Sequence, residues 1–348
     1  MWRKFLFILA LIILIGGGIA GYYGYNLYQK IYAPQVTLPD EKEETFIHIP
    51  SGADIETVTD ILLDDNLIKD GSSFQWTAEL MNYIDNIHSG RYRIEDGMNN
   101  RELLNLLRSG KQEPVQLRLR ERMTAPEIAG FFGQNLEADS ARIMELLNDE
   151  QYLQKYDLNT HTAIALFLPD TYEFYWDIDA GEFVDRMYWE YQQFWTEEKR
   201  EKAENLGFTP MEVTILASIV EAETYRYDEM PTIAGVYLNR LERGMKLQAD
   251  PTVIFAIEDR NVSRVTFQDL QVDSPYNTYQ NPGLPPGPIG SPGKRALEAV
   301  LNPEDHSYLY FCAKADFSGY HEFSETYSEH RRCARRYQHQ LNQMGITN

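Results

Sequence analysis

The chain has 348 residues, with 53 acidic against 32 basic side chains and a formal net charge of −21. This length allows two domains with substantial cores. An acidic chain without a block of Lys or Arg argues against nucleic acid as a partner.

The N-terminus combines charge and apolar length. Arg3 and Lys4 precede an uncharged, mainly apolar stretch from Phe5 to about Tyr25, which is long enough to span a bilayer as a helix. Positive charge before it predicts a cytoplasmic N-terminus and export of the chain after Lys30. A cleaved signal peptide is the alternative, but no clear Ala-x-Ala site is present. We therefore expect a retained single-pass membrane anchor over residues 1–30.

A strand–turn–helix unit is expected three times after a linker. Residues 31–45, with the acidic run Asp40–Glu44, are typical of a solvated tether. The expected strands cover residues 45–50, 91–94 and 115–119, and the expected helices cover 54–63, 99–107 and a segment starting at 124. Asn99 with Glu102 and Thr124 with Glu127 have capping-box spacing. The first two copies predict a small module over residues 46–112, and the third begins a larger domain over 113–348.

The next region is helix-rich to about residue 207, and it leads to the most informative stretch of the chain. Thr209 is an expected N-cap, followed by Pro210 and by Glu212 at capping-box spacing. Residues 211–220 are apolar on nearly every face, which predicts a buried helix. Glu221 and Glu223 stand at its C-terminal end.

Both glutamates are expected to have a raised pKa if they are buried. Apolar surroundings and the negative end of the helix dipole both disfavour the charged form of a carboxyl group. A carboxylic acid with a raised pKa can donate a proton near neutral pH. The alternative is that both side chains face water where the helix ends. Glu223 is about 200° around the helix from Glu221, so the two are not expected to face one point.

The remainder of the chain is expected to contain two further helices, a stiff loop and two strands. One helix covers about 231–243 and stops at Gly244, and another starts at Asp250 as N-cap with Pro251 in its first position. Residues 274–293 are crowded with Pro and Gly, and such a long loop is more often functional than filler. Strands at 308–313 and near 321–324 and a basic C-terminal helix follow. The fold class is therefore α+β.

The two cysteines have no metal-binding or CxxC spacing. Cys312 lies in an apolar run, which indicates a buried strand residue. A disulfide with Cys333 is the alternative in an exported chain.

The assembled motifs resemble the MltG-type, YceG-like endolytic murein transglycosylases of bacteria. The resemblance covers the whole chain and is most specific in three blocks: Ala217-Ser-Ile-Val-Glu-Ala-Glu-Thr, Asn239 through Gln248-Ala-Asp-Pro-Thr-Val, and Tyr276-Asn-Thr-Tyr through Gly283-Leu-Pro-Pro-Gly-Pro-Ile. One departure is Thr162-Ala-Ile-Ala-Leu, where the family usually has a Glu-Gly pair, so the local turn is expected to differ.

The resemblance implies a LysM-like module over residues 46–112, a catalytic domain, and a single-pass protein of the bacterial inner (cytoplasmic) membrane whose catalytic domain is periplasmic. It also implies cleavage of peptidoglycan glycan strands between N-acetylmuramic acid and N-acetylglucosamine, leaving 1,6-anhydro ends and terminating nascent strands. The family's catalytic glutamate matches Glu221. No metal or organic cofactor is implied, and peptidoglycan synthases are candidate partners.

The other motif residues are expected to bind substrate or to support the site. Asp250 is either a helix cap or a second carboxyl group. Gln248 has no capping position, so it either hydrogen-bonds to substrate or is structural. Glu223 is expected to support the site through a hydrogen bond. Sugar binding and turn formation are both open for the residues of the stiff loop. The full supporting set is Ser218, Glu223, Gln248, Asp250, Tyr276, Asn277, Thr278 and Tyr279.

Two other function classes are alternatives. A peptidoglycan-binding scaffold of the wall-synthesis machinery would use the same sugar-binding module without catalysis. A pyridoxal-phosphate lyase would need a lysine in a site-like motif, and the sequence offers none.

Overall fold

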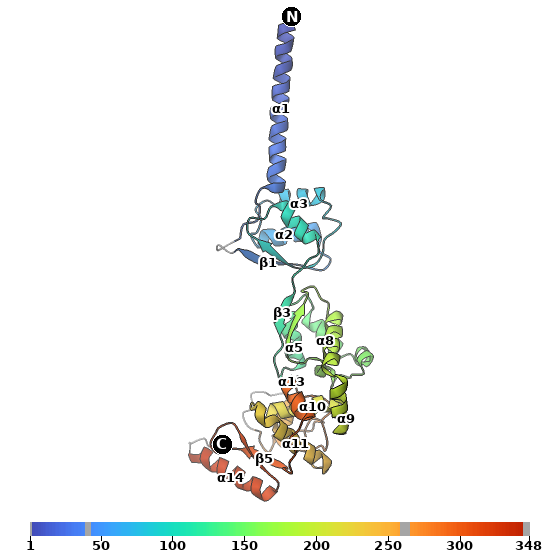
Figure 1. Cartoon of the computed structure of the whole chain (residues 1–348), viewed down its shortest axis with the longest axis vertical. Helices are drawn as coiled ribbons and strands as arrows, with labels where there is room; N and C mark the ends of the chain where they lie inside the picture. The colour runs from blue at the N-terminus through green and yellow to red at the C-terminus, as the bar shows by residue number, and fades with distance from the viewer. Residues whose placement is uncertain (1, 39–42, 258–264, 344–348) are drawn as a thin grey trace. The chain divides into compact units, whose positions relative to one another are not determined.

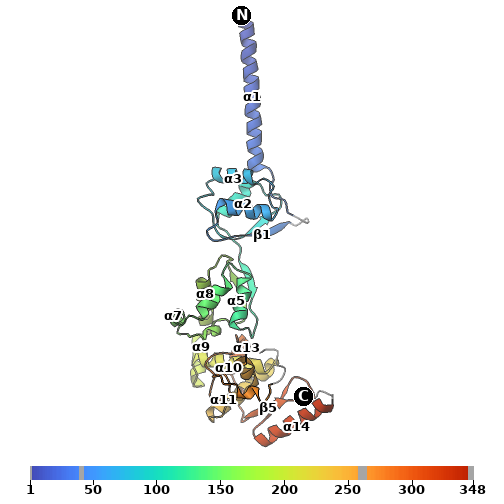
Figure 2. The same cartoon turned by 180° about the vertical axis from the view of Figure 1, so that it is seen from behind.

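The computed structural model describes residues 2–38, 43–257 and 265–343. It divides into two compact units, drawn from opposite sides in Figure 1 and Figure 2. Unit 1 comprises Met1–Gln116, Asn135–Glu137 and Glu173–Ile178, and unit 2 comprises Leu117–Gln134, Ala138–Tyr172 and Asp179–Asn348. Among the described residues the strands form three separate two-stranded sheets, β1–β2, β3–β4 and β5–β6. The architecture is therefore mixed α/β with a majority of helix.

The first element is the long helix α1, Trp2–Tyr32. Its segment Phe5–Tyr32 is long and apolar enough to cross a membrane, and none of it is buried. At its C-terminal end the carbonyl oxygen of Lys30 accepts a hydrogen bond of 2.9 Å from the Asn100 side chain. The predicted apolar helix is thus present and runs two residues beyond the expected end.

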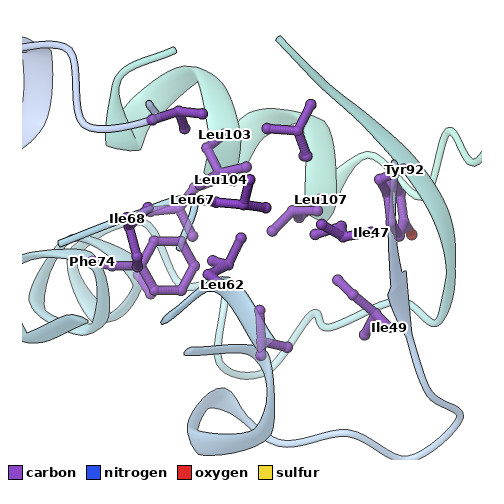
Figure 3. Packing of buried hydrophobic residues seen from close by; sticks show 14 of the residues in the cluster. Ile47, Ile49, Leu62, Leu67, Ile68, Phe74, Tyr92, Leu103, Leu104 and Leu107 are labelled. Carbon is purple, nitrogen blue, oxygen red and sulfur yellow. The ribbon is translucent and has the colours of Figure 1, made fainter. Parts of the chain in front are cut away.

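Unit 1 continues with two strands and three helices around one core. Its elements are β1 Glu44–Ile49, α2 Ile55–Asp64, α3 Gly71–Leu80, β2 Gly90–Glu95 and α4 Asn100–Arg108. Strands β1 and β2 are antiparallel, with Ile47 opposite Tyr92. Side chains of both strands point at the helices, and Figure 3 shows Ile47 and Ile49 facing Leu62 and Leu107. The predicted capping box of α4 at Asn99 is present, whereas α3 was not predicted from the sequence.

The prediction of a solvated tether over residues 31–45 is wrong for its middle part. Val36 and Leu38 are buried in the core of unit 1. The backbone N–H of Val36 donates to the Met98 carbonyl at 2.9 Å, and that of Thr37 donates to the Leu67 carbonyl at 2.9 Å. Val36 and Leu38 are apolar and pack into this core, although the prolines and acidic residues around them are typical of a solvated tether. Residues 39–42 of the predicted acidic run lie outside the described residues.

Unit 2 is mainly helical. Strands β3 Val115–Arg118 and β4 Thr171–Phe174 pair with each other. The helices before the candidate site are α5 Ala125–Gly133, α6 Ser140–Leu147, α7 Glu150–Leu153, α8 Ala180–Phe194 and α9 Glu197–Asn205. Those that build the site are α10 Pro210–Glu223, α11 Met230–Glu242, α12 Asp250–Ala256 and α13 Lys294–Leu301. The departure at residues 162–166 folds as a short 3₁₀ turn, Ala163–Leu166.

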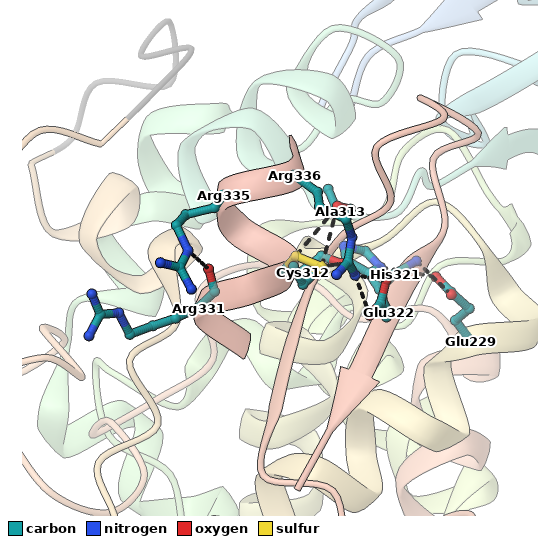
Figure 4. The surroundings of a disulfide bond; sticks show 9 residues. Glu229, Cys312, Ala313, His321, Glu322, Arg331, Arg335 and Arg336 are labelled. Atoms are coloured by element: carbon teal, nitrogen blue, oxygen red, sulfur yellow. Dashed lines mark hydrogen bonds and ion pairs between the residues drawn. A yellow bond between two sulfur atoms is a disulfide. The ribbon is translucent and has the colours of Figure 1, made fainter. Parts of the chain in front are cut away.

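A disulfide closes the C-terminal part of unit 2. Strands β5 Tyr310–Ala313 and β6 His321–Ser324 are antiparallel, and α14 Tyr327–Gln343 follows. Cys312 in β5 is bonded to Cys333 in α14, with Cα atoms 6.4 Å apart (Figure 4). Arg336 in α14 also pairs with Glu322 in β6 at 2.6 Å. The interpretation of Cys312 as a free buried strand residue is therefore wrong, because its side chain is only half-buried and crosslinks strand to helix.

Candidate active site

Helix α10 carries the two candidate carboxyl groups. The backbone N–H of Glu212 donates to Thr209 Oγ1 at 3.2 Å, and Glu212 Oε2 accepts from the backbone N–H of Thr209 at 2.7 Å. The predicted capping box is confirmed. All residues from Val213 to Glu221 are buried, as the apolar sequence predicts. The helix therefore holds the start of its last turn inside unit 2.

The carboxyl group of Glu221 lies against a glycine backbone. The side chain is 1% exposed, and the backbone N–H of Gly293 donates to its Oε1 at 3.0 Å and to its Oε2 at 3.2 Å. A Cβ atom on Gly293 would lie 2.7 Å from Glu221 Oε1 and 2.8 Å from Glu121 Oε1. A glycine is needed for this close approach. The same two distances place the Glu121 and Glu221 oxygens no more than about 5.5 Å apart, the sum of the two.

The predicted rise in the pKa of Glu221 is present in this environment. Burial, and next the negative charge of Glu121, raise the pKa of Glu221 to about 7. The Gly293 N–H and the Arg122 guanidinium act in the opposite direction because they favour the carboxylate. The group can therefore exchange a proton near neutral pH.

Arg122 ties three segments together at this point. Its guanidinium donates to the backbone carbonyl of Glu221 and, at 2.7 Å, to that of Thr224. Its own backbone N–H donates to the Ser291 carbonyl at 2.9 Å, and its guanidinium lies 4.2 Å from the centre of the Tyr225 ring. A cation at a helix C-terminus offsets the dipole there. Arg122 thus donates hydrogen bonds to backbone carbonyls at the end of α10 and holds the stiff loop beside them.

A cavity of about 270 Å³ opens over Glu221. Its walls come from α10, α12 and the stiff loop, and they are more apolar than polar. The lining residues are Arg122, Ser218, Glu221, Ala222, Tyr225, Pro251, Ile254, Phe255, Ile289 and Gly290. An apolar cleft with one convergent acid is a typical form of a catalytic site.

Ser218 attaches the stiff loop to α10. Its Oγ donates to the Ile215 carbonyl at 2.7 Å and accepts from the backbone N–H of Ile289 at 3.1 Å. Gly287 in the same loop approaches the His161 carbonyl so closely that a Cβ atom would lie 2.0 Å from that oxygen. The loop is therefore held at several points around the cavity.

Glu223 faces a different cavity, as the 200° separation predicts. This second cavity, of about 330 Å³, is lined by residues of α10, α11, α12, β5 and α14, and it shares no lining residue with the cavity over Glu221. The Tyr237 hydroxyl donates to Glu223 Oε1 at 2.6 Å. Burial raises the pKa of Glu223 to about 7, although the hydrogen bond from Tyr237 lowers it.

Asp250 is not the cap of α12. The N-cap position belongs to Ala249, and Asp250 is the first helical residue. Its Oδ1 accepts a hydrogen bond of 2.5 Å from the Tyr279 hydroxyl. The cap prediction is wrong by one position because the turn before the helix is closed by another contact, between the Ala249 N–H and Thr278 Oγ1 at 3.0 Å.

Gln248 has a left-handed backbone, with φ of +51°, and its exposed side chain lines the cavity beside Glu223. Its backbone N–H donates to the Thr278 carbonyl at 3.2 Å. A conformation that most residues avoid holds the side chain at the cavity wall.

Three residues of the stiff loop turn inward. Asn277 is fully buried and donates to the carbonyls of Leu270 and Val272 at 3.1 and 2.9 Å. Thr278 is buried and hydrogen-bonds to Thr252 at 2.8 Å. Tyr276 is buried, with its ring 4.6 Å from that of Phe255 and its hydroxyl 3.3 Å from His161 Nδ1. These three side chains shape the loop. Of the four loop residues 276–279, only Tyr279 lines the second cavity.

Glu121, Arg122 and Gly293 were missed from the sequence. Glu121 and Arg122 lie about 100 positions before Glu221, in a charged turn after β3. A charged turn directly after a strand was the available signal, because side chains there are often functional. Gly293 was inside the predicted functional loop but was not singled out.

Comparisons with known proteins identify the family of this chain. A family model described as the YceG-like family matches residues 47–336, so this chain belongs to the YceG-like family. A relative from Bacillus subtilis (strain 168), named endolytic murein transglycosylase, is 29% identical over 341 residues, covering 93% of this chain and 91% of the relative. A protein of the same name from Streptococcus pneumoniae (strain D39) is 29% identical over 327 residues, covering 84% of this chain and 58% of that relative.

A solved structure has the same fold. The crystal structure of a protein described as YceG-like from Listeria monocytogenes matches with a TM-score of 0.57 and 30% sequence identity. The match covers 84% of this chain and 99% of that one. Among the described residues no group of three or more His, Cys, Asp or Glu side chains is arranged to hold a metal ion.

Proposed function

We propose that this chain is an endolytic murein transglycosylase, a lyase that cleaves peptidoglycan glycan strands with Glu221 as its general acid and base. The observation that carries the proposal is the buried carboxyl group of Glu221, with a pKa of about 7, at the floor of a mainly apolar cavity. The names of the relatives supply the substrate class.

One carboxyl group suffices for the proposed reaction. Protonated Glu221 gives its proton to the oxygen of the bond between N-acetylmuramic acid and N-acetylglucosamine, and the bond from that oxygen to the anomeric carbon breaks. The resulting carboxylate then takes the proton of the 6-hydroxyl, whose oxygen bonds to the anomeric carbon. The product is a 1,6-anhydro end, no water is consumed, and Glu221 is protonated again.

The surroundings of Glu221 suit both halves of this cycle. Burial and the negative charge of Glu121 favour the protonated acid that begins the reaction. The Gly293 N–H, at 3.0 Å, favours the carboxylate that exists after the first proton transfer. The Glu121 carboxylate, whose Oε1 lies within about 5.5 Å of Glu221 Oε1, stabilises the positive charge that develops on the sugar ring.

The position of Glu121 also favours a second candidate function. In a retaining glycoside hydrolase, a nucleophilic carboxylate lies about 5–5.5 Å from the acid. The upper limit of about 5.5 Å between the Glu121 and Glu221 oxygens is compatible with that spacing, and Glu121 would then form a covalent sugar intermediate that water hydrolyses. The two reactions differ in their products, since hydrolysis leaves a reducing end.

The remaining parts of the chain suit a membrane-bound enzyme. We propose that α1 is retained as a single-pass anchor of the cytoplasmic membrane with its N-terminus inside, so that both units lie on the outer side. The β1–α2–α3–β2 arrangement of unit 1 supports a LysM-like role in positioning glycan, within the predicted span 46–112. Cleavage of nascent strands near their synthases would terminate glycan polymerisation.

Mass analysis of the products from purified, peptide-free glycan strands tests the proposal. Wild-type protein should release anhydro ends, and Glu221→Gln should release at least about 10²-fold less while melting at a similar temperature. Reducing ends would support hydrolysis instead. Absence of any product would leave the chain a peptidoglycan-binding scaffold and contradict the proposal.

A further inference from the structure

The cavity beside Glu223 is built like a binding site in its own right. Its volume of about 330 Å³ lies in the range of small-ligand sites. Three of the elements that line it, α11, β5 and α14, contribute nothing to the Glu221 cavity. No step of the proposed reaction needs it.

Two carboxyl groups in this cavity are held in place by tyrosines. The Tyr237 hydroxyl donates to Glu223 at 2.6 Å, and the Tyr279 hydroxyl donates to Asp250 at 2.5 Å. A carboxylate has about four acceptor sites, so each group keeps further sites for a ligand. The exposed amide of Gln248 adds both a donor and an acceptor.

Aromatic rings line the same cavity. The ring of His330 lies 5.5 Å from that of Tyr310 and 6.2 Å from that of Tyr327, with interplanar angles of 27° and 30°. Tyr327 is 60% exposed, so its ring is open to a ligand. A lining of flat rings and hydrogen-bonding side chains matches a sugar, which has apolar C–H faces and hydroxyl groups around its edge.

The charge balance of the cavity favours a neutral ligand. Arg240 is buried in the wall, where its guanidinium donates to the carbonyls of Leu247 and Leu309 at 2.5 and 2.6 Å. Its positive charge opposes those of Glu223 and Asp250. An ammonium group would meet this guanidinium, and an anion would meet the two carboxyl groups. A polyhydroxyl ring meets neither obstacle.

We propose that the cavity lined by Glu223, Asp250, Gln248, Tyr279, Tyr310 and Tyr327 binds a neutral pyranose ring of a glycan chain, separately from the ring that reacts over Glu221. The inference rests on the proposed function for its substrate class. Both cavities take part of their lining from α10 and α12, and the second cavity would hold another ring of the substrate during cleavage.

Binding measured on the full chain in detergent micelles tests this inference. The Glu221→Gln protein prevents cleavage, and a β-1,4-linked tetramer of N-acetylglucosamine serves as the probe in titration calorimetry. Tyr327→Ala should raise the dissociation constant about threefold to tenfold, the range for loss of one stacked ring. Trp189→Ala removes a similarly exposed ring (51%) from α8, which lines neither cavity, and is the matched control, with no change expected.

A second variant and a mapping experiment guard against misfolding. Asp250→Asn keeps the size of the side chain and should also weaken binding several-fold. Hydrogen exchange should slow in residues 310–313 and 327–333 when the tetramer is added. An unchanged dissociation constant in both variants, or no measurable binding of the tetramer, overturns the inference. Displacement of the tetramer by lysine amide would instead identify an ammonium site and also overturn it.

The tetramer-binding test and the product analysis can fail independently of each other. Failure of wild-type protein to give anhydro ends would contradict the chemistry at Glu221, whereas loss of tetramer binding in Tyr327→Ala would still support the sugar site. Anhydro ends together with unchanged tetramer binding would support the chemistry at Glu221 and overturn the sugar site.

Discussion

Glu221 and Glu223 stand two residues apart at the end of one helix, and burial raises the pKa of both to about 7. Their partners differ. Glu221 meets a glycine N–H and a mainly apolar cavity, whereas Glu223 meets a tyrosine hydroxyl in a polar cavity that also contains Asp250. A raised pKa alone therefore does not assign a catalytic acid. The difference in partners is the reason why we propose chemistry at the first carboxyl group and binding at the second.

The largest expected effect comes from exchanging each acid for its amide. Glu221→Gln should lower kcat by about 10²–10⁴-fold, because the amide has no proton to donate and cannot later act as a base. Glu223→Gln should cost far less, since Gln still accepts a hydrogen bond from Tyr237. Rates of anhydro-product release, with thermal melts of both variants, provide the measurement. A larger loss in Glu223→Gln than in Glu221→Gln would reverse the two roles.

A methyl group placed against Glu221 gives the next largest effect. In Gly293→Ala the new Cβ would lie 2.7 Å from Glu221 Oε1, so the carboxyl group must move. We expect the rate to fall about tenfold or more, because small misplacements of a reacting group are costly. Gly290→Ala is the comparison, since its Cβ would meet its nearest neighbour, the Arg122 backbone, at 3.4 Å. Equal losses in the two variants would argue against a positional requirement at Gly293.

Changes of nearby charge should move the pH profile in opposite directions. Activity needs protonated Glu221, so the rate should fall as pH rises through about 7. The Glu121 charge raises the pKa of Glu221, and therefore Glu121→Gln should shift this limb to lower pH. Arg122→Gln should shift it to higher pH, because the guanidinium lowers that pKa. At pH 8 the rate of each variant, expressed relative to its own plateau, should differ from that of the wild type by about twofold to fivefold. Limbs that stay in place would show that another group controls the fall.

The smallest effect concerns stability and the Glu223 side. A carboxyl group whose pKa rises from 4.5 to about 7 on folding binds its proton more tightly in the folded state. The free energy of unfolding therefore falls as pH rises between those values. Glu223→Gln removes this loss, so its melting temperature relative to wild type should be higher at pH 8 than at pH 5 by a few degrees. Exposed Glu204→Gln is the control, and an equal difference at both pH values would contradict the burial of Glu223.

Local signals explain what the sequence could predict. The capping box at Thr209 and the apolar run behind it define α10 without any distant contact, and the angle between Glu221 and Glu223 follows from helix geometry. The predictions of caps at Asn99 and Thr124 are confirmed for the same reason. Each of these features depends on residues only a few positions apart.

The unpredicted features all depend on distant partners. The amide of Asn277 could have faced a ligand or its own loop, and only the folded loop shows that it turns inward. Arg122 reaches the end of α10 from 99 positions away. Burial of Val36 and Leu38 depends on the core of unit 1, which no local pattern in the linker reveals.

The disulfide between Cys312 and Cys333 gives the second cavity a dependence on cellular compartment. The bond joins β5, which carries Tyr310, to α14, which carries Tyr327. Thiols stay reduced in the cytoplasm and pair in oxidising surroundings. In an exported chain the aromatic wall is therefore crosslinked only after translocation, so maturation of this cavity would follow delivery of the enzyme to the wall.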